Sequence, residues 1–537
     1  GVNENQTGLT IGDDYFSDGA GNIKQFMTST TTTSTTNMTV TPASAGEQLI
    51  GYGTVHNMST VYDTTNDKFI TLYVDENNSH YLTAVAHHIS TVSTGAVTYG
   101  TPVVISSMNM SSMTQSKMLA FDDNSGKCLA AYKDSNSNGG IATVLGISSG
   151  TTISAGATET FIASNNPWAL HIDYDSNANK FAIFWTDTSD GYKGKACTAT
   201  IAGNGTDVSF GTVMTFSGTD DVRQKSAAFD PDTNKFLVAW ENNTDTAGEA
   251  AVATISGTDI SFGTTVVIQT DSFAYVDVGY DQNVNKFLVA FADSGDSSKL
   301  KNVVGTISGT DVSFGSEVEI HDRYHADGNL IYDPDLEMLV FTSYMYNSGN
   351  SAVESMVARY IKIDGTTPSL LKSSVFHTAQ VHESATSSAY DVDNDRMIVT
   401  YSNENKDVAS YVLQQAFNTT TTHTQTDSQF IGKAIAADKL LLEEQDPNII
   451  YGKASNSITK GDTIIVEADG DFAKISGSTS SGSEYNPKTE YVSGSSKAEN
   501  TSDKFYLANN GSGIFALITI GNSNHTRITL GQDSGTS

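Results

Sequence analysis

Aspartate-rich segments recur along the chain, and their side chains could bind calcium. Calcium loops place oxygen ligands at alternate positions, although a complete loop also has a glycine and a distal glutamate that these segments lack. The segments are Asp230-Pro-Asp-Thr-Asn234, Asp333-Pro-Asp335 and Asp391-Val-Asp-Asn-Asp395. Because Asp and Asn also cap tight turns by bonding their own backbone, the repeated turn favours a structural role. The sequence thus predicts no cofactor other than Ca²⁺, with Asp391, Asp393 and Asp395 as the candidate ligands.

Two histidine pairs are weaker metal-site candidates. His321 and His325 are four residues apart, a spacing that converges on a helix but not in a strand or loop. His87 and His88 lie in an expected strand, where consecutive side chains point to opposite faces. Neither pair is expected to bind a metal.

The composition is acidic and favours strands. The 537 residues include 61 acidic and 29 basic ones, for a formal net charge of −32. Such a surface repels phosphate backbones and anionic lipids, so we expect no nucleic-acid binding. No apolar run approaches the ~20 residues that span a bilayer, so we expect no membrane insertion. Abundant Thr, Ser, Gly and Asn favour strands and turns over helices.

A repeated motif indicates the architecture. Phe229–Trp240, Tyr280–Phe291 and Tyr174–Trp185 each contain an aromatic residue, Asp, three variable positions, Asn-Lys-Phe and an apolar run. Four weaker copies exist, and the leading aspartates are Asp63, Asp122, Asp175, Asp230, Asp281, Asp333 and Asp391. Successive aspartates lie 51 to 59 residues apart, which is the length of a four-stranded propeller blade.

Each unit divides into four expected strands. In the fifth unit they are Ala274–Tyr280, Phe287–Ala292, Asn302–Ser308 and Val312–Ile320. The second strand is continuously apolar, as in strands buried on both faces, and a glycine within the fourth predicts a bulge or bend. The sequence therefore predicts an all-β fold, a seven-bladed β-propeller with a small terminal β-rich domain. A parallel solenoid and a row of β-sandwiches are the rival architectures.

We expect three regions. Residues 1–50 hold an N-terminal hairpin and a Thr-rich linker, residues 51–428 the propeller, and residues 429–537 a C-terminal β-rich assembly or attachment domain. The Thr-rich tract at 28–36 fits either a linker or the strand that closes the ring. Lys433–Glu444 is predicted to be a helix. The strands expected after it are Asp462–Ala468, Phe505–Ala508, Ile514–Ile520 and Thr526–Leu530.

The two ends of the chain contain similar sequence patterns. Leu9–Gly19 and Ile458–Gly470 both read as a Gly-Asp turn, a strand and an Asp-Gly turn. This similarity suggests that the termini contribute similar hairpins to one base domain.

Three motifs resemble those of tail and fibre proteins of marine bacteriophages. Thr7–Gly19 resembles a hairpin common in those proteins, and Ile431–Leu442 resembles the piece that usually follows it. The blade signature Asp-x-x-x-Asn-Lys-Phe-Leu-Val-Ala-Trp is similar to their repeats. In the family the two terminal motifs are close together, whereas here the whole propeller separates them, which fits a propeller inserted into a base domain.

The resemblance implies a virion structural protein, a tail-fibre or adhesin-like component located on the virion or outside the cell. It implies that the termini bind other virion proteins and that the propeller contacts a host cell-surface glycan or protein. Such proteins are commonly homo-oligomers, often trimers, so the resemblance implies a homo-oligomer.

A secreted carbohydrate-binding or carbohydrate-cleaving propeller is the alternative function. Sialidases are propellers that use a Tyr nucleophile and an acidic pair, and an arginine cluster that binds the substrate carboxylate. The five arginines here are scattered: Arg223, Arg323, Arg359, Arg396 and Arg527. The Ser-x-Asp-x-Gly-x-Thr-Trp box of that family is absent. We therefore expect a non-enzymatic protein without catalytic residues.

Overall fold

The fold was derived from a computed structural model, in which nearly every element is a strand. The structure describes residues 30–425 apart from 52–53, 111–116, 347–352, 379–380 and 382–385, and outside this range only the strands named below. It divides into two units, Met38–Phe417 and a terminal unit of Gly1–Asn37 with Asn418–Ser537. Among the described residues, no helix has the length and apolar character needed to cross a membrane.

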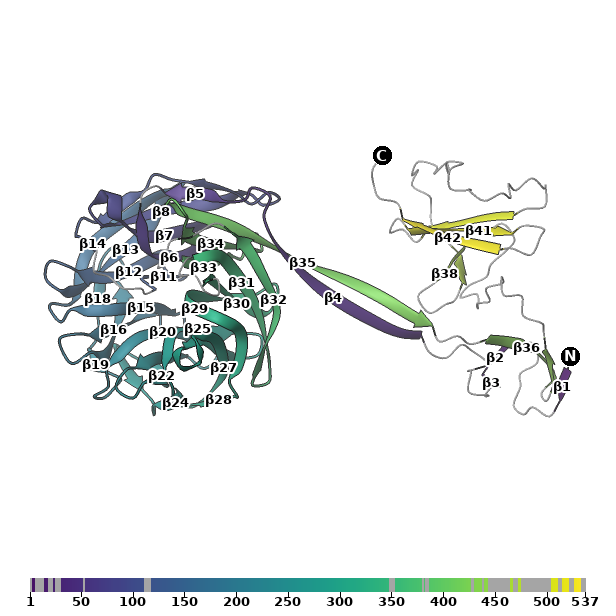
Figure 1. Ribbon diagram of the computed structural model, residues 1–537. Helices are drawn as coiled ribbons and strands as arrows, with labels where there is room; N and C mark the ends of the chain where they lie inside the picture. The colour runs from purple at the N-terminus through teal and green to yellow at the C-terminus, as the bar shows by residue number, and fades with distance from the viewer. Residues whose placement is uncertain are drawn as a thin grey trace. The chain divides into compact units, whose positions relative to one another are not determined.

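Antiparallel strands form the seven blades of a β-propeller in the larger unit (Figure 1), which confirms the predicted fold class. Blade 1 comprises β6 (Val55–Asp63), β7 (Lys68–Asp75), β8 (Tyr81–Thr91), β9 (Ala96–Tyr99) and β10 (Val103–Ser106). Blade 2 comprises β11 (Leu119–Asp122), β12 (Lys127–Asp134), β13 (Gly139–Ser149) and β14 (Thr152–Ile162). Blade 3 comprises β15 (Pro167–Asp175), β16 (Lys180–Asp187), β17 (Lys193–Ile201), β18 (Val208–Phe210) and β19 (Met214–Thr215).

The remaining blades repeat this plan. Blade 4 comprises β20 (Val222–Asp230), β21 (Lys235–Asn242), β22 (Ala247–Ser256), β23 (Asp259–Phe262) and β24 (Val266–Gln269). Blade 5 comprises β25 (Phe273–Asp281), β26 (Lys286–Asp293), β27 (Lys299–Ser308) and β28 (Asp311–Phe314). Blade 6 comprises β29 (Val318–Asp333), β30 (Met338–Tyr346), β31 (Val353–Asp364) and β32 (Thr367–His377), and the start of β29 also pairs with β27 of blade 5. Short 3-10 helices, η1 (Glu76–Asn78) and η2 (Ser294–Asp296), follow the second strands of blades 1 and 5.

N-terminal strands complete blade 7 and close the ring. Blade 7 has β33 (Thr386–Asp391), β34 (Arg396–Ser402) and β35 (Val408–Gln425) from the end of the propeller sequence. Its outer edge is β4 (Thr30–Pro42) and β5 (Gln48–Gly51), which both pair with β35. Residues 38–51 belong to the propeller unit and close the ring, whereas the Thr-rich tract at 28–36 falls in the terminal unit, with residues 30–36 in the first part of β4.

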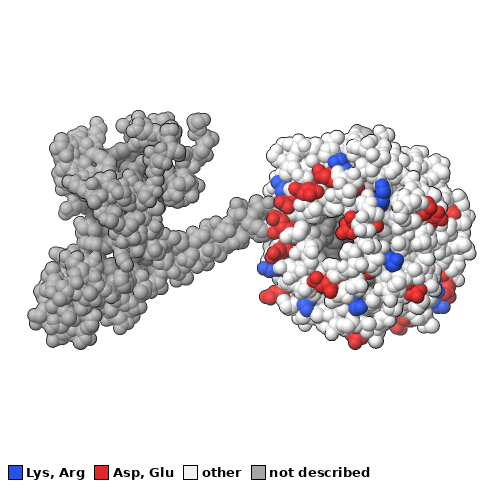
Figure 2. All heavy atoms as spheres, turned by 180° about the vertical axis from the view of Figure 1, so that it is seen from behind, with Lys and Arg blue, Asp and Glu red and all other residues white. Residues whose placement is uncertain are grey.

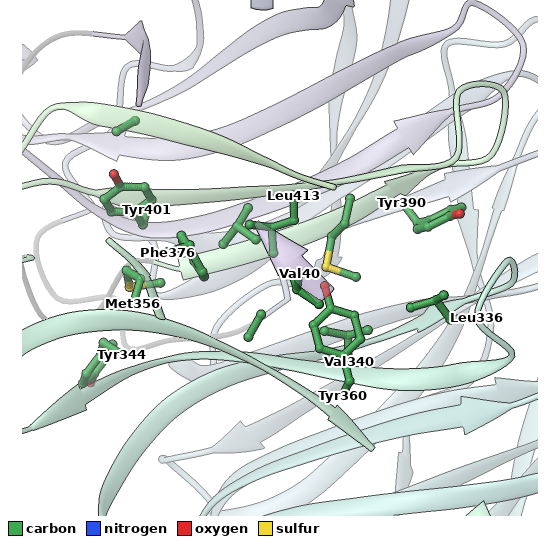
Figure 3. Close-up of a cluster of buried hydrophobic side chains, with 14 of the residues drawn as sticks. Val40, Leu336, Val340, Tyr344, Met356, Tyr360, Phe376, Tyr390, Tyr401 and Leu413 are labelled. Carbon is green, nitrogen blue, oxygen red and sulfur yellow. The ribbon is translucent and has the colours of Figure 1, made fainter. Parts of the chain in front are cut away.

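The hydrophobic core lies between adjacent blades. The second strand is buried on both faces, and in β21 every side chain from Phe236 to Trp240 has 0% exposure. Figure 3 shows the cluster between blades 6 and 7, in which Val40 of β4 lies among side chains that include Met356, Phe376 and Leu413. The closing strand thus contributes apolar packing as well as backbone pairing.

The glycine in the fourth strand marks a strand break, where the next blade approaches. In blade 4, β23 ends at Phe262 and β24 begins at Val266. A Cβ on Gly263 between them would overlap the carbonyl oxygen of Thr310, in the turn before the outer strand of blade 5. Gly211 and Gly315 face Thr258 and Thr366 of their next blades in the same way. The predicted bend is therefore a contact between blades that leaves no room for a side chain.

The described residues of the terminal unit form three sheets. The largest has the strand order β1 (Val2–Glu4), β37 (Lys439–Leu442), β36 (Gln429–Ala436), β2 (Asp14–Ser17), β3 (Ile23–Lys24). The others are β38 (Ile464–Val466) with β39 (Phe472–Lys474), and β40 (Lys504–Asn509), β41 (Ile514–Ile520) and β42 (Thr526–Gln532). Both expected terminal hairpins form, as β2–β3 and β38–β39.

The helix predicted over Lys433–Glu444 is wrong. Its described residues form parts of the antiparallel strands β36 and β37, with Lys433 opposite Leu441. β36 also pairs with β2, and β37 pairs with β1, so the N-terminal segment supplies partners on both sides. A helix this short is marginal by itself, and long-range pairing overrides its local propensity.

Replacing Gly263 with alanine should destabilise the propeller. The added methyl group must displace the blade 5 turn, which should cost about 1–3 kcal/mol as overpacking does elsewhere. Gly203→Ala is the matched control, since a Cβ there meets no atom within 4 Å. Urea unfolding should show a lower midpoint for Gly263→Ala and little change for Gly203→Ala, and equal midpoints would contradict the proposed contact.

Candidate functional site

The repeated aspartate caps the turn between the first two strands of every blade. Asp230 Oδ1 accepts hydrogen bonds from the backbone N–H groups of Asp232 and Thr233, at 2.8 and 3.2 Å. The residue four positions after each leading aspartate has a positive φ in all seven blades, as Asp395 does at 52°. Asp and Asn suit such turns because their side chains bond the local backbone and tolerate this conformation. The motif found in the sequence is therefore a hairpin-forming element.

The structure brings together only two of the three predicted calcium ligands. Carboxylate oxygens of Asp391 and Asp393 lie within 4.8 Å of each other and of Asp67 from blade 1. Asp395 is not part of this group. The Tyr62 hydroxyl lies 2.6 Å from Asp393 Oδ2 and 2.8 Å from Asp67 Oδ1, so its single proton can be donated to either carboxylate. Calcium binding here remains a prediction, with Asp67 as a third ligand that the sequence did not indicate.

Side chains of the inner strands form a ring of hydrogen bonds around the propeller axis. A polar group on each of six blades accepts a hydrogen bond from an N–H of the next blade's inner strand. Five acceptors are side chains four residues before the leading aspartate, and the sixth is the carbonyl oxygen of Lys117. The donor and acceptor pairs are Ala227–His171 (3.2 Å), Val278–Ser226 (3.1 Å), Leu330–Asp277 (2.5 Å), Ser388–Asn329 (2.9 Å), Thr60–Ser387 (2.9 Å) and Ile172–Lys117 (3.0 Å).

This ring surrounds a central cavity of about 110 Å³ that all seven blades line. The lysine, histidine and aspartate side chains that line it are Lys117, His171, Lys225 and Asp277. Lys117 forms a 2.7 Å ion pair with Asp173. Figure 2 shows a central hollow in the propeller, with acidic and basic side chains scattered singly around it. The cavity is the candidate functional site because it gathers charged groups in one enclosed place.

Burial shifts the protonation of three cavity groups. It lowers the pKa of Lys225 to about 7, and its Nζ donates to the carbonyl oxygens of Ala169 (2.8 Å) and Arg223 (3.3 Å). Burial also raises the pKa of Asp277 to about 6, although hydrogen bonds from Ser226, Leu330 and Val278 oppose this rise. The pKa of His171 lies well below its usual value for the same reason. Groups that titrate near neutrality in a cavity are the type that acid–base chemistry needs.

The histidine candidates form no joint site in the described structure. His87 is fully buried and its Nε2 lies 2.8 Å from Thr71 Oγ1, whereas His88 is only half-buried. His321 lies in β29, and the side chain of His325 lies outside the described residues.

Sequence reasoning missed the cavity residues, although the repeat contained a signal. Four positions before the leading aspartate, six of seven units have a polar residue. They are Ser59, His171, Ser226, Asp277, Asn329 and Ser387, with Met118 in the second unit. A position that is polar in most copies of an otherwise apolar repeat indicates that its side chain forms a hydrogen bond in each copy. The residue type at this position varies from unit to unit.

Comparison with known proteins identifies no family. No protein-family model matches the chain, and no curated protein does. AofleA from Arthrobotrys oligospora is similar in structure, with 10% identity, a TM-score of 0.39 and coverage of 64% of this chain and 91% of that one. A protein from Lactobacillus plantarum has 12% identity, a TM-score of 0.42 and coverage of 72% and 100%. The β-propeller domain of the Trilobed protease from Pyrococcus furiosus has 10% identity, a TM-score of 0.38 and coverage of 70% and 97%.

Lys225 should make stability depend on pH above neutrality. An unfolded lysine has a pKa of about 10.4, so from pH 7 to 10 the unfolded chain binds a proton that the folded chain does not. The contribution of Lys225 to the free energy of unfolding is therefore lowest below pH 7 and rises between pH 7 and 10. The variant Lys225→Met removes the group, so its unfolding free energy should rise less between pH 7 and 9 than that of the wild type.

Chemical denaturation at several pH values measures this slope. Lys68→Met, which removes a lysine outside the cavity, is the control and should keep the wild-type slope. An unchanged slope in Lys225→Met would show that Lys225 remains charged in the folded protein.

Proposed function

We propose that the chain is a non-enzymatic virion structural protein, a phage tail-fibre or adhesin-like component that displays its propeller for attachment to a host surface. One observation carries this proposal. The chain enters and leaves the propeller through β4 and β35 of the same blade, and the segments beyond them pair in one terminal sheet. A propeller that is joined to the terminal unit through two adjacent strands is suited to being displayed on a larger assembly.

The terminal unit would make the assembly contacts. Its largest described sheet joins strands from before and after the propeller in the sequence. We propose that this unit binds other virion proteins and forms a homo-oligomer, with a trimer as the arrangement typical of fibres. The propeller would then be free to contact a host glycan or protein.

The hydrogen bonds of the cavity support a non-catalytic role. His171, Ser226, Asp277 and Asn329 are each engaged with the backbone of the next blade, so their side chains already hold the ring together. Groups with that role cannot change position or protonation freely without loosening the inner strands.

A secreted carbohydrate-binding or carbohydrate-cleaving propeller is the second candidate. It is favoured by the pKa values of about 7 and 6 for Lys225 and Asp277, which line one cavity. In this case glycans should bind at the cavity, and Asp277→Asn should abolish any cleavage. Asp207→Asn, which removes an exposed carboxylate outside the cavity, is the matched control.

Mass spectrometry of gradient-purified particles should detect this chain at a fixed ratio to capsid proteins. That result is expected because a fibre component is built into every particle in a set number. Recovery of the chain only from the soluble fraction would contradict the virion proposal, and a glycan screen of that fraction would then test the second candidate.

A further inference from the structure

Three side chains from separate parts of the sequence meet where the ring closes. Glu47 lies between β4 and β5, His377 ends β32 of blade 6, and Glu404 lies in the turn between β34 and β35 of blade 7. One ligand atom from each lies within 4.8 Å of the others. These residues come together only when the N-terminal strands complete blade 7.

His377 is positioned between the two carboxylates. Its Nδ1 lies 3.4 Å from Glu47 Oε2, and its Nε2 lies 3.7 Å from Glu404 Oε2. The side chain is 7% exposed, yet Nε2 has no hydrogen-bond partner in the described structure. A buried ring nitrogen without a partner is costly, so it points to a group that is missing from this place.

Neighbouring side chains hold the cluster in position. The Tyr401 hydroxyl donates to Glu47 Oε2 at 2.6 Å and lies 3.3 Å from His377 Nδ1. Asn403 Nδ2 donates to Glu47 Oε1 at 2.9 Å. Burial and the nearby Glu47 raise the pKa of Tyr401, so it remains a hydrogen-bond donor. In known metal sites, hydrogen-bond partners of this kind orient the side chains that bind the metal.

We propose that Glu47, His377 and Glu404 bind a divalent transition-metal ion of the Zn²⁺ or Mn²⁺ class, which fastens the N-terminal segment to blades 6 and 7. An imidazole and two carboxylates match the nitrogen and oxygen ligands these ions accept, whereas Ca²⁺ and Mg²⁺ prefer oxygen alone. Ligand atoms lie ~2.0–2.2 Å from a zinc ion, so the three residues would move toward one another when an ion binds. Glu404 is 44% exposed, which leaves a side open for water.

The ion would act on stability. Because the ligands assemble only in the closed ring, the folded chain binds the metal more tightly than the unfolded chain, and binding therefore opposes opening of blade 7. This inference does not rest on the proposed function, since it concerns closure of the propeller in any setting.

Titration of the metal-stripped full-length protein with ZnCl₂ and with MnCl₂ at pH 7 tests the proposal. Calorimetry should show one site per chain for at least one of these ions, and saturation should raise the melting temperature. CaCl₂ should bind this site at least tenfold more weakly.

His377→Gln and Glu404→Gln should each weaken binding at least tenfold. Glu404 is partly exposed, so Glu404→Gln should fold even if His377→Gln does not, and circular dichroism checks both. Glu337→Gln, which removes an exposed carboxylate of blade 6, is the matched control and should bind like the wild type. Unchanged binding in Glu404→Gln would overturn the proposal by placing the ion elsewhere.

A His377 side chain that bridges both glutamates without an ion is the competing explanation. It predicts no binding of Zn²⁺ or Mn²⁺ and no rise in melting temperature when either ion is added. That pair of results would also overturn the metal site.

Discussion

The innermost strand of each propeller blade has backbone N–H groups that point toward the axis and need hydrogen-bond acceptors. The rest of this structure depends on how those acceptors are supplied. Each blade's first strand has only one neighbour in its own sheet, so its inward N–H groups face the channel without a partner. Here the preceding blade supplies the acceptor, as Ser226 does for Val278 and Asn329 does for Ser388. The blades are therefore joined by hydrogen bonds at the axis and by apolar packing farther out.

This constraint explains the chemistry of the cavity. An acceptor is needed at each junction, but its identity is not fixed, so serine, histidine, aspartate and asparagine all occur at the same position. Burial then shifts the pKa of Asp277 upward because its carboxylate is enclosed among the inner strands. Closure of the ring also requires strands from the N-terminal segment. This segment contributes β4 and β5 to blade 7, and Val40 becomes part of the core between blades 6 and 7.

The fold could be predicted because its determinants repeat locally. The aspartate turn, the apolar second strand and the mid-strand glycine each lie within one unit, and seven copies indicate a ring. The helix expected over Lys433–Glu444 was wrong because its partners, β1 and β2, are more than 400 residues away in the sequence. A long separation in the sequence also hid the approach of Asp67 to Asp391, since the first and last blades touch only after closure. The Glu47, His377 and Glu404 cluster was missed for this reason as well.

Hydrogen exchange of single backbone amides tests the central claim most directly, using mass spectrometry with fragmentation that locates individual residues. If neighbouring blades supply the acceptors, the amides of Thr60, Ala227, Val278, Leu330 and Ser388 should exchange as slowly as those of the buried second strand Lys235–Asn242. Exchange at the rate of exposed turn residues would contradict the account, because it would show that the inner edges are bonded to water and that apolar packing alone holds the ring.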